Sequence, residues 1–229
     1  MPQLKKKILD LIKQEDPINP LAFAHDIIKD YAHEKLCDYI SSCQDCSICT
    51  QKSFPEGNTR ADLMIILESS IGSPKAFQSF YLLEKLYNHY NVNQDYIYYI
   101  NSVNCYPQKV IEDRIIHRPP SKEEVNNCKV FLEYAIDIVK PKAIVLMGAV
   151  ALNVFKKESI SKARGTFIDI KGIKAMPTYH PDYFLHSQGK KHPDLIEEDK
   201  ADFCDDFKKV LLYINDNFQY QNLIGAMIK

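Results

Sequence analysis

Four short apolar runs recur along the chain, separated by stretches in which apolar residues have helical spacing. The runs cover residues 62–67, 96–100, 143–147 and 174–178. A continuous apolar run of this length is typical of a strand covered on both faces of a parallel sheet. The stretches between them, such as 123–139, favour helices. This alternation predicts an α/β fold, a three-layer α/β/α sandwich around a four-stranded, mainly parallel sheet with right-handed crossovers.

Helical patterns also occur at the two ends of the chain. Residues 2–40 predict two helices, because apolar residues recur at helical spacing on both sides of Pro17 and Pro20. We therefore divide the chain into an N-terminal helical arm, residues 1–40, and a main domain, residues 41–229. The acidic C-terminal segment predicts a closing helix.

Two segments between the predicted strands and helices have less regular patterns. Residues 166–172 predict a short hairpin at the edge of the sheet. Residues 106–121 predict a long polar segment without an assigned strand or helix.

The composition fits a single domain with an added arm. The chain has 229 residues, of which 45% are hydrophobic, which is enough for one core. Its apolar runs are much shorter than a membrane span. The N-terminus has no secretory pattern, because Asp10, Lys13 and Glu15 interrupt any hydrophobic stretch. We expect a cytoplasmic monomer that does not contact a membrane.

The balance of charge excludes a globally basic nucleic-acid binder. The formal net charge is −1, so any contact with DNA has to come from a local patch. Two candidate patches exist, and each can equally be a solvated loop. They consist of Lys156, Lys157, Lys162 and Arg164, and of His186, Lys190, Lys191 and His192.

Seven cysteines in a cytoplasmic chain point to metal binding, since that compartment keeps thiols reduced. Cys43, Cys46 and Cys49 form two overlapping pairs with two residues between the sulfurs, a spacing that suits thiolate ligation. Cys105 and Cys128 stand singly beside polar residues. These residues can serve a zinc ion or an iron-sulfur cluster, and the softness of the ligands does not decide between them. The two other cysteines, Cys37 and Cys204, fit helix positions in the core.

Three polar residues directly follow predicted strands. Glu68 and Asn101 end the first two strands, and His180 lies in Thr178-Tyr179-His180-Pro181, just past the fourth. Because the carboxyl ends of parallel strands share one edge of a sheet, where α/β proteins bind ligands, we expect these side chains to converge. The alternative is that each residue caps its own strand.

The order of several segments resembles the uracil-DNA glycosylase superfamily, specifically its iron-sulfur branch, called family 4. The resemblance extends from Cys43 to Leu185. The matching segments are the C-x2-C before Glu56-Gly57-Asn58, Tyr99-Ile100-Asn101 leading to Cys105-Tyr106-Pro107, Glu124 followed by Cys128, Pro141 to Gly148, Arg164-Gly165, and Pro177 to Pro181.

The resemblance implies a [4Fe-4S] cluster with a structural role. Its ligands would be Cys43, Cys46, Cys105 and Cys128. The pair Cys46 and Cys49 is the alternative to Cys43 and Cys46.

The resemblance also implies roles for the strand-end residues in removing uracil from DNA, single- or double-stranded, as in base-excision repair. His180 would donate a hydrogen bond to uracil O2, and Asn101 would pair with the polar edge of the base. Either Phe77 or Phe80 would stack on the flipped base. Glu68 would polarise the nucleophile or stabilise the sugar cation.

Two features depart from the family pattern. The loop after Glu68 is Ser69-Ser70-Ile71-Gly72, where the family has Pro-Gly. This change favours two alternatives. The protein can be catalytically altered and bind DNA or a modified base, or it can be a glycosylase for another modified base. The segment 113–121 resembles the Arg-Arg-Ile-His loop of the X-type glycosylases. On this alternative, His117 attacks the sugar, stays covalently attached to the DNA, and uses Glu68 as its base.

Overall fold

The structure is a computed structural model that describes residues 20–47, 51–69, 74–112, 114–187 and 192–218. It confirms the α/β fold with a mainly parallel sheet, but the sheet has six strands, not four. Their order across the sheet is β1 (Glu56–Gly57), β3 (Ile97–Val103), β2 (Leu63–Ser69), β6 (Ala143–Met147), β8 (Ile173–Thr178) and β7 (Ile168–Ile170).

The additional strands lie at the two edges of the sheet. The four central strands are parallel and correspond to the four predicted runs, whereas β1 and β7 pair antiparallel with β3 and β8. The prediction missed β1 because a strand of two exposed residues leaves no hydrophobic pattern. It placed β7 in an edge hairpin without counting it as a strand.

Alternating side chains of β2 create the two halves of the core. Leu63, Ile65 and Leu67 face α3 (Pro74–His89), α7 (Pro181–Ser187) and α8 (Pro193–Phe218). Met64 and Ile66 face the opposite layer. That layer contains α2 (Pro20–Ser42), α4 (Lys122–Val139), α5 (Ala149–Phe155) and α6 (Ile160–Ala163).

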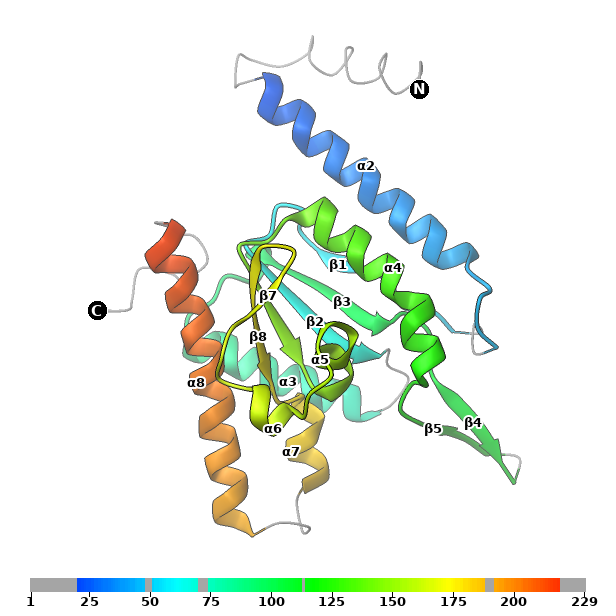
Figure 1. Cartoon of the computed structure of the whole chain (residues 1–229), viewed down its shortest axis with the longest axis vertical. Coiled ribbons are helices and arrows are strands. Elements are labelled where there is room, and N and C mark those ends of the chain that lie inside the picture. Colours follow the sequence, from blue (N-terminus) through cyan, green and yellow to red (C-terminus); the bar gives the residue numbers. More distant parts are fainter. Residues whose placement is uncertain (1–19, 48–50, 70–73, 113, 188–191, 219–229) are drawn as a thin grey trace.

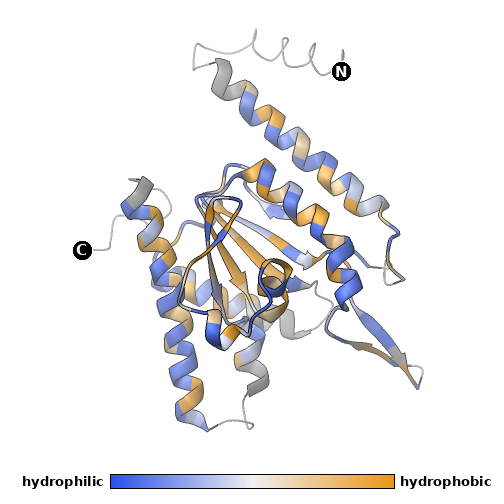
Figure 2. Ribbon diagram, in the orientation of Figure 1, coloured by the Kyte–Doolittle hydropathy of each residue, from blue (hydrophilic) through white to orange (hydrophobic). Residues whose placement is uncertain are grey.

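The result is the predicted three-layer sandwich (Figure 1). Figure 2 shows that hydrophobic residues dominate the central strands, while the helices are striped with polar residues. None of the helices in the described ranges is both long enough and apolar enough to cross a bilayer.

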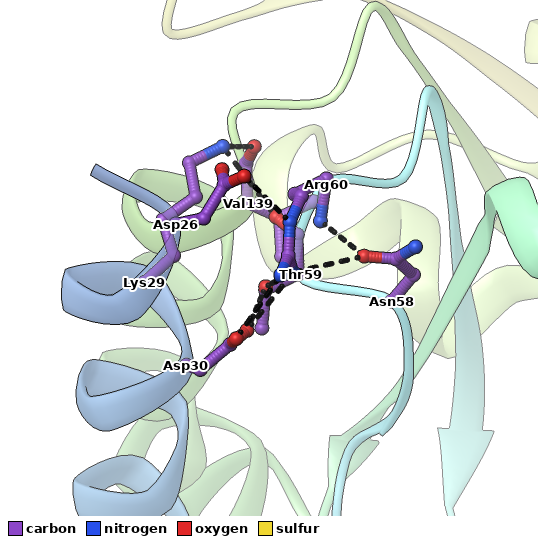
Figure 3. Close-up of polar contacts among 7 residues, drawn as sticks. All are labelled: Asp26, Lys29, Asp30, Asn58, Thr59, Arg60 and Val139. Atoms are coloured by element: carbon purple, nitrogen blue, oxygen red, sulfur yellow. Dashed lines mark hydrogen bonds and ion pairs between the residues drawn. The ribbon is translucent and has the colours of Figure 1, made fainter. Parts of the chain in front are cut away.

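Helix α2, the described part of the predicted arm, is joined to the main domain by charged residues (Figure 3). Arg60 pairs with Asp26 at 3.2 Å and with Asp30 at 3.1 Å. Lys29 Nζ donates to the carbonyl oxygen of Val139 at 2.9 Å.

The C-terminal half of α2 also contributes to the core, because Leu36 and Ile40 are buried there. The division of the chain at residue 40 remains our proposal. The first predicted helix, before Pro17, lies outside the described residues.

The predicted polar segment 106–121 instead contains a β-hairpin, which corrects the prediction. Strands β4 (Gln108–Ile111) and β5 (Arg114–His117) pair antiparallel and form a separate sheet that extends away from the sandwich (Figure 1). The β-branched residues of these strands favour this structure. The prediction missed it because Ile111, Ile115 and Ile116 are exposed rather than part of a core.

Candidate active site

The parallel register brings the predicted strand-end residues to one edge of the sheet. Leu67 pairs with Asn101 between β2 and β3, so Glu68 lies one residue past that pair. Met147 pairs with Thr178 between β6 and β8, so His180 follows two residues later. Since β2 and β6 are neighbours, all of these positions lie at adjacent carboxyl ends.

Glu68 and His180 both lie beside Gly148, the N-cap residue directly before α5. A Cβ atom placed on Gly148 would lie 3.0 Å from His180 Cβ and 3.8 Å from Glu68 Oε2. Gly148 also has φ of +94°, which a larger residue rarely adopts. Glycine at this position therefore allows the carboxylate and the imidazole to approach the same point.

The hydrogen bond to the His180 ring determines its tautomer. The backbone N–H of Asp182 donates to His180 Nδ1 at 3.2 Å. Because Nδ1 accepts, the proton of the neutral ring has to be on Nε2, which is then a donor. The ring thus offers the site one defined N–H, on Nε2.

Glu68 is an unusual carboxyl group, because it is largely enclosed. Burial raises the pKa of Glu68, and the negative charge of Asp182 raises it further. A group that combines burial with a nearby like charge is typical of a functional site.

Asn101 lines a cavity of about 470 Å³ on the α3 side of the sheet. Its Nδ2 donates to Ser53 Oγ at 3.0 Å, whereas its Oδ1 is buried and has no hydrogen-bond partner among the described residues. A buried acceptor without a partner is costly, so this atom is suited to a ligand that donates.

The cavity contains one of the two candidate stacking residues. Phe80 lines it and is 43% exposed. Phe77 lies in α3, but its side chain is outside the described part of the structure. Glu68 and His180 are not among the described residues that line this cavity, and residues 70–73, the altered loop, fall outside the description. The structure therefore places Glu68 and His180 beside Gly148, and Asn101 and Phe80 around one cavity.

Two residues at the site were not predicted from the sequence. Ser53 holds the Asn101 amide, and Asp182 holds the His180 ring. Asp182 directly follows His180-Pro181, so its spacing could have been noticed. Ser53 left no pattern, because backbone contacts between distant segments bring it near Asn101, among them the hydrogen bond from its own N–H to the Asn104 carbonyl oxygen, at 2.9 Å.

The four candidate cluster cysteines lie at the same part of the core. Cys105 and Cys128 are buried, and Cys43 and Cys46 pack against the same cluster of residues. Lys52 forms a β-bridge with Cys105 and donates through Nζ to the carbonyl oxygen of Cys43.

On the other side, Asn127, the neighbour of Cys128, has Nδ2 3.5 Å from Cys46 Sγ. All four thiols are free of disulfides. Within the described ranges, no three His, Cys, Asp or Glu side chains are grouped closely enough to hold a metal ion. Cys49 is outside these ranges.

The remaining candidates have different outcomes. His117 ends β5, where it pairs with Gln108 at the base of the hairpin, and its side chain is not described.

In the first basic patch, Lys156 pairs with Glu158. Arg164 is 16% exposed and pairs with Asp202 and Asp206. Arg164 therefore faces the protein. In the second patch, His192 pairs with Asp194, and the side chains of residues 186, 190 and 191 are outside the described part of the structure.

The fold and these side chains define an α/β/α protein with a polar site at the carboxyl ends of its parallel strands. Residues 54–204 match the model of the uracil DNA glycosylase superfamily. The type-4 uracil-DNA glycosylase of Thermotoga maritima is 31% identical over 186 residues, which cover 74% of this chain and 93% of that protein. The type-4 enzyme of Saccharolobus solfataricus is 29% identical over 211 residues, 81% of this chain and 90% of the relative.

A further relative, the type-4 uracil-DNA glycosylase of Archaeoglobus fulgidus, is 26% identical and covers 72% of this chain and 86% of its own length. The chain belongs to the uracil DNA glycosylase superfamily, in its type-4 branch.

Proposed function

We propose that this protein excises uracil from DNA by hydrolysing the bond between the base and deoxyribose. The observation that carries this proposal is that Glu68 and His180, whose Nδ1 accepts a hydrogen bond, both lie beside Gly148, one strand away from the unpaired amide oxygen of Asn101. The names of the type-4 relatives agree with it. Its partner is uracil-containing DNA.

His180 supports the departure of the base. As the glycosidic bond breaks, negative charge develops on the uracil ring and positive charge on the sugar. The His180 Nε2–H would donate to uracil O2 while this charge grows. The Nε2–H suits this role, because the hydrogen bond at Nδ1 leaves it as the defined donor of the ring.

Asn101 accounts for the choice of base. With one Nδ2 hydrogen donated to Ser53, the other remains for uracil O4, and Oδ1 remains for the N3–H of uracil. Cytosine has an acceptor at N3 and a donor at N4, so both contacts would be mismatched. Phe80, with Phe77 as the alternative, would stack on the flipped base.

Glu68 acts on the sugar. Its carboxylate would stabilise the positive charge on the sugar and orient the attacking water. The oxygen of this water bonds to C1′ and the water releases one proton. The departing uracil anion takes up a proton. The nearby Asp182 adds a second negative charge, which favours the sugar cation.

The cysteines fit an iron-sulfur cluster at the end of this core. Lys52 links the backbones around Cys43 and Cys105, and Asn127 links Cys46 to the helical turn of Cys128, so the three chain segments that carry these thiols are connected. A cluster of several irons holds its thiolates farther apart than a single ion does, which agrees with described thiols that are not grouped closely enough for one ion. When bound, the group would supply cross-links between these segments.

The direct test is a strand-cleavage assay. We expect an oligonucleotide that contains one uracil to be cut at that position after treatment with alkali, and the matching thymine oligonucleotide to remain intact. Tight binding to DNA without any product would favour the catalytically altered binding protein instead. Excision of another modified base but not of uracil would show a different specificity.

A second candidate is covalent capture of the DNA by His117, as in the X-type glycosylases. It is favoured by the position of His117 at the base of the hairpin, which only four residues separate from β3, the strand of Asn101. The expected product is a protein-DNA adduct that survives denaturation and is lost in His117→Ala. Free uracil and an unmodified protein would rule it out.

Glu68 is expected to control the pH dependence of the reaction. The carboxylate form of Glu68 is the active one, so kcat should fall as the pH drops through the pKa of Glu68. Because burial raises this pKa, the fall should occur at a higher pH than for an ordinary glutamate. Glu68→Gln should lower kcat by about 100-fold or more and lose this acidic limb. The check is the pH profile of single-turnover rates.

Asp182→Asn is the matched variant for this prediction. It removes one negative charge beside Glu68, so the acidic limb should move to lower pH. A limb at the same pH in wild type and Glu68→Gln would assign it to another group.

A further inference from the structure

The turn that carries His180 is held from both sides by one carboxylate of α8. Tyr179 precedes His180, and Tyr183 follows it in α7. Their hydroxyl groups donate to the two oxygens of Asp199, at 3.0 Å and 2.6 Å. The two tyrosine rings are stacked, with centroids 4.8 Å apart and an angle of 10° between their planes. The turn between them is therefore closed by the hydrogen bonds to Asp199 and by the stacked rings.

A second carboxylate of α8 holds the end of β8. Asp206 is completely buried and accepts a hydrogen bond from Thr178 Oγ1 at 2.9 Å. Arg164 binds the same carboxylate through Nε and Nη2, both at 3.0 Å. The guanidinium of Arg164 also lies 5.6 Å from the centre of the Tyr179 ring. Thr178 and Tyr179, the two residues before His180, are thus fixed to this pair.

These contacts exceed what packing of α8 requires. Asp199, Asp202 and Asp206 are spaced three and four residues apart, so they share one face of the helix. The apolar residues Phe203, Phe207 and Val210 already bury α8 against the sheet. Burial raises the pKa of Asp206, which shows the cost of placing a carboxylate there, and Arg164 and Thr178 oppose that effect.

We propose that α8 positions the imidazole of His180, with Asp199 and Asp206 as positioning residues that act through Tyr179, Tyr183 and Thr178. This inference rests on the proposed glycosylase function. Burial and the hydrogen bond to Asp199 raise the pKa of Tyr179 to about 12, so its hydroxyl stays a donor throughout the working range of the enzyme. A displacement of about 1 Å at a reacting group can cost about 100-fold in rate, so a fixed turn has a direct catalytic consequence.

The variant that tests this is Tyr183→Phe, which removes one hydroxyl and keeps the stacked ring. We expect kcat to fall about 10-fold with KM within about 2-fold of wild type, because substrate binding does not use this hydroxyl. The matched control is Tyr90→Phe. Tyr90 also donates to α8, to the carbonyl oxygen of Cys204 at 3.2 Å, but far along the chain from His180, so its loss should leave kcat unchanged.

A double variant separates positioning from general destabilisation. In a His180→Ala background, Tyr183→Phe should have no further effect on the rate, because the group it positions is gone. An additional 10-fold loss in that background, or an equal loss in Tyr90→Phe, would overturn the proposal.

Nitrogen NMR of the His180 ring tests the geometry without relying on activity. The wild-type ring should be the Nε2-protonated tautomer, and both Tyr183→Phe and Asp199→Asn should shift it toward a mixture. Unchanged ring shifts in both variants would overturn the proposal even if the protein excises uracil. A wild type without excision activity, but with the expected shifts, would contradict the proposed function alone.

Discussion

His180→Ala is expected to lower kcat for uracil excision by about 100- to 1000-fold, with little change in the affinity for DNA. The imidazole offers one defined donor, because its Nδ1 is occupied by the backbone N–H of Asp182. The charge on the departing base exists mainly in the transition state, so the loss should appear in kcat rather than in KM. Single-turnover cleavage of a uracil oligonucleotide measures it.

His89→Ala is the control for this prediction. His89 is an exposed residue at the end of α3 and contacts the Tyr90 ring, so its replacement should leave the rate unchanged. A His180→Ala variant with nearly wild-type kcat would show that another group stabilises the departing base, and His117 would be the first alternative to examine.

Cys128→Ser is expected to abolish the iron-sulfur centre and to lower Tm substantially. Cys128 is buried in the second turn of α4, next to Asn127, which contacts Cys46. Loss of one ligand should release the links between three chain segments, because the binding free energy of a structural metal centre is part of the folding free energy. The checks are iron content, the broad absorbance near about 400 nm and a thermal melt.

Cys204→Ser is the matched control, since Cys204 lies in α8, away from the other cysteines. It should keep both iron and Tm. A colourless wild type that contains one zinc per chain would contradict the cluster and favour the zinc alternative. Equal iron content in wild type and Cys128→Ser would remove Cys128 from the ligand set.

The hydrophobic pattern predicted the central part of the fold well. The four parallel strands are buried on both faces, so each leaves an apolar run that does not depend on its neighbours. The edge strand β1 and the β4–β5 hairpin were not predicted, because few of their side chains enter the core. Exposed strands are set by their hydrogen-bond partners, which the local pattern does not contain.

The candidate site shows the same division. Glu68, Asn101 and His180 could be named from the sequence, because the end of a strand is a local feature and parallel strands share an edge. The contacts of these residues could not be named. Ser53 reaches Asn101 across 48 positions, and Asp206 reaches Thr178 across 28.

The sequence by itself determined the α/β class, the central strands and the residue types at their carboxyl ends. Buried strands and their ends can be recognised from the hydrophobic pattern of a short stretch of chain. Only the tertiary structure decided that Glu68 and His180 both lie beside Gly148 and that α8 holds the turn that carries His180. Such contacts depend on how α5 and α8 pack against the sheet, and packing of distant segments is set by the whole core rather than by any one segment.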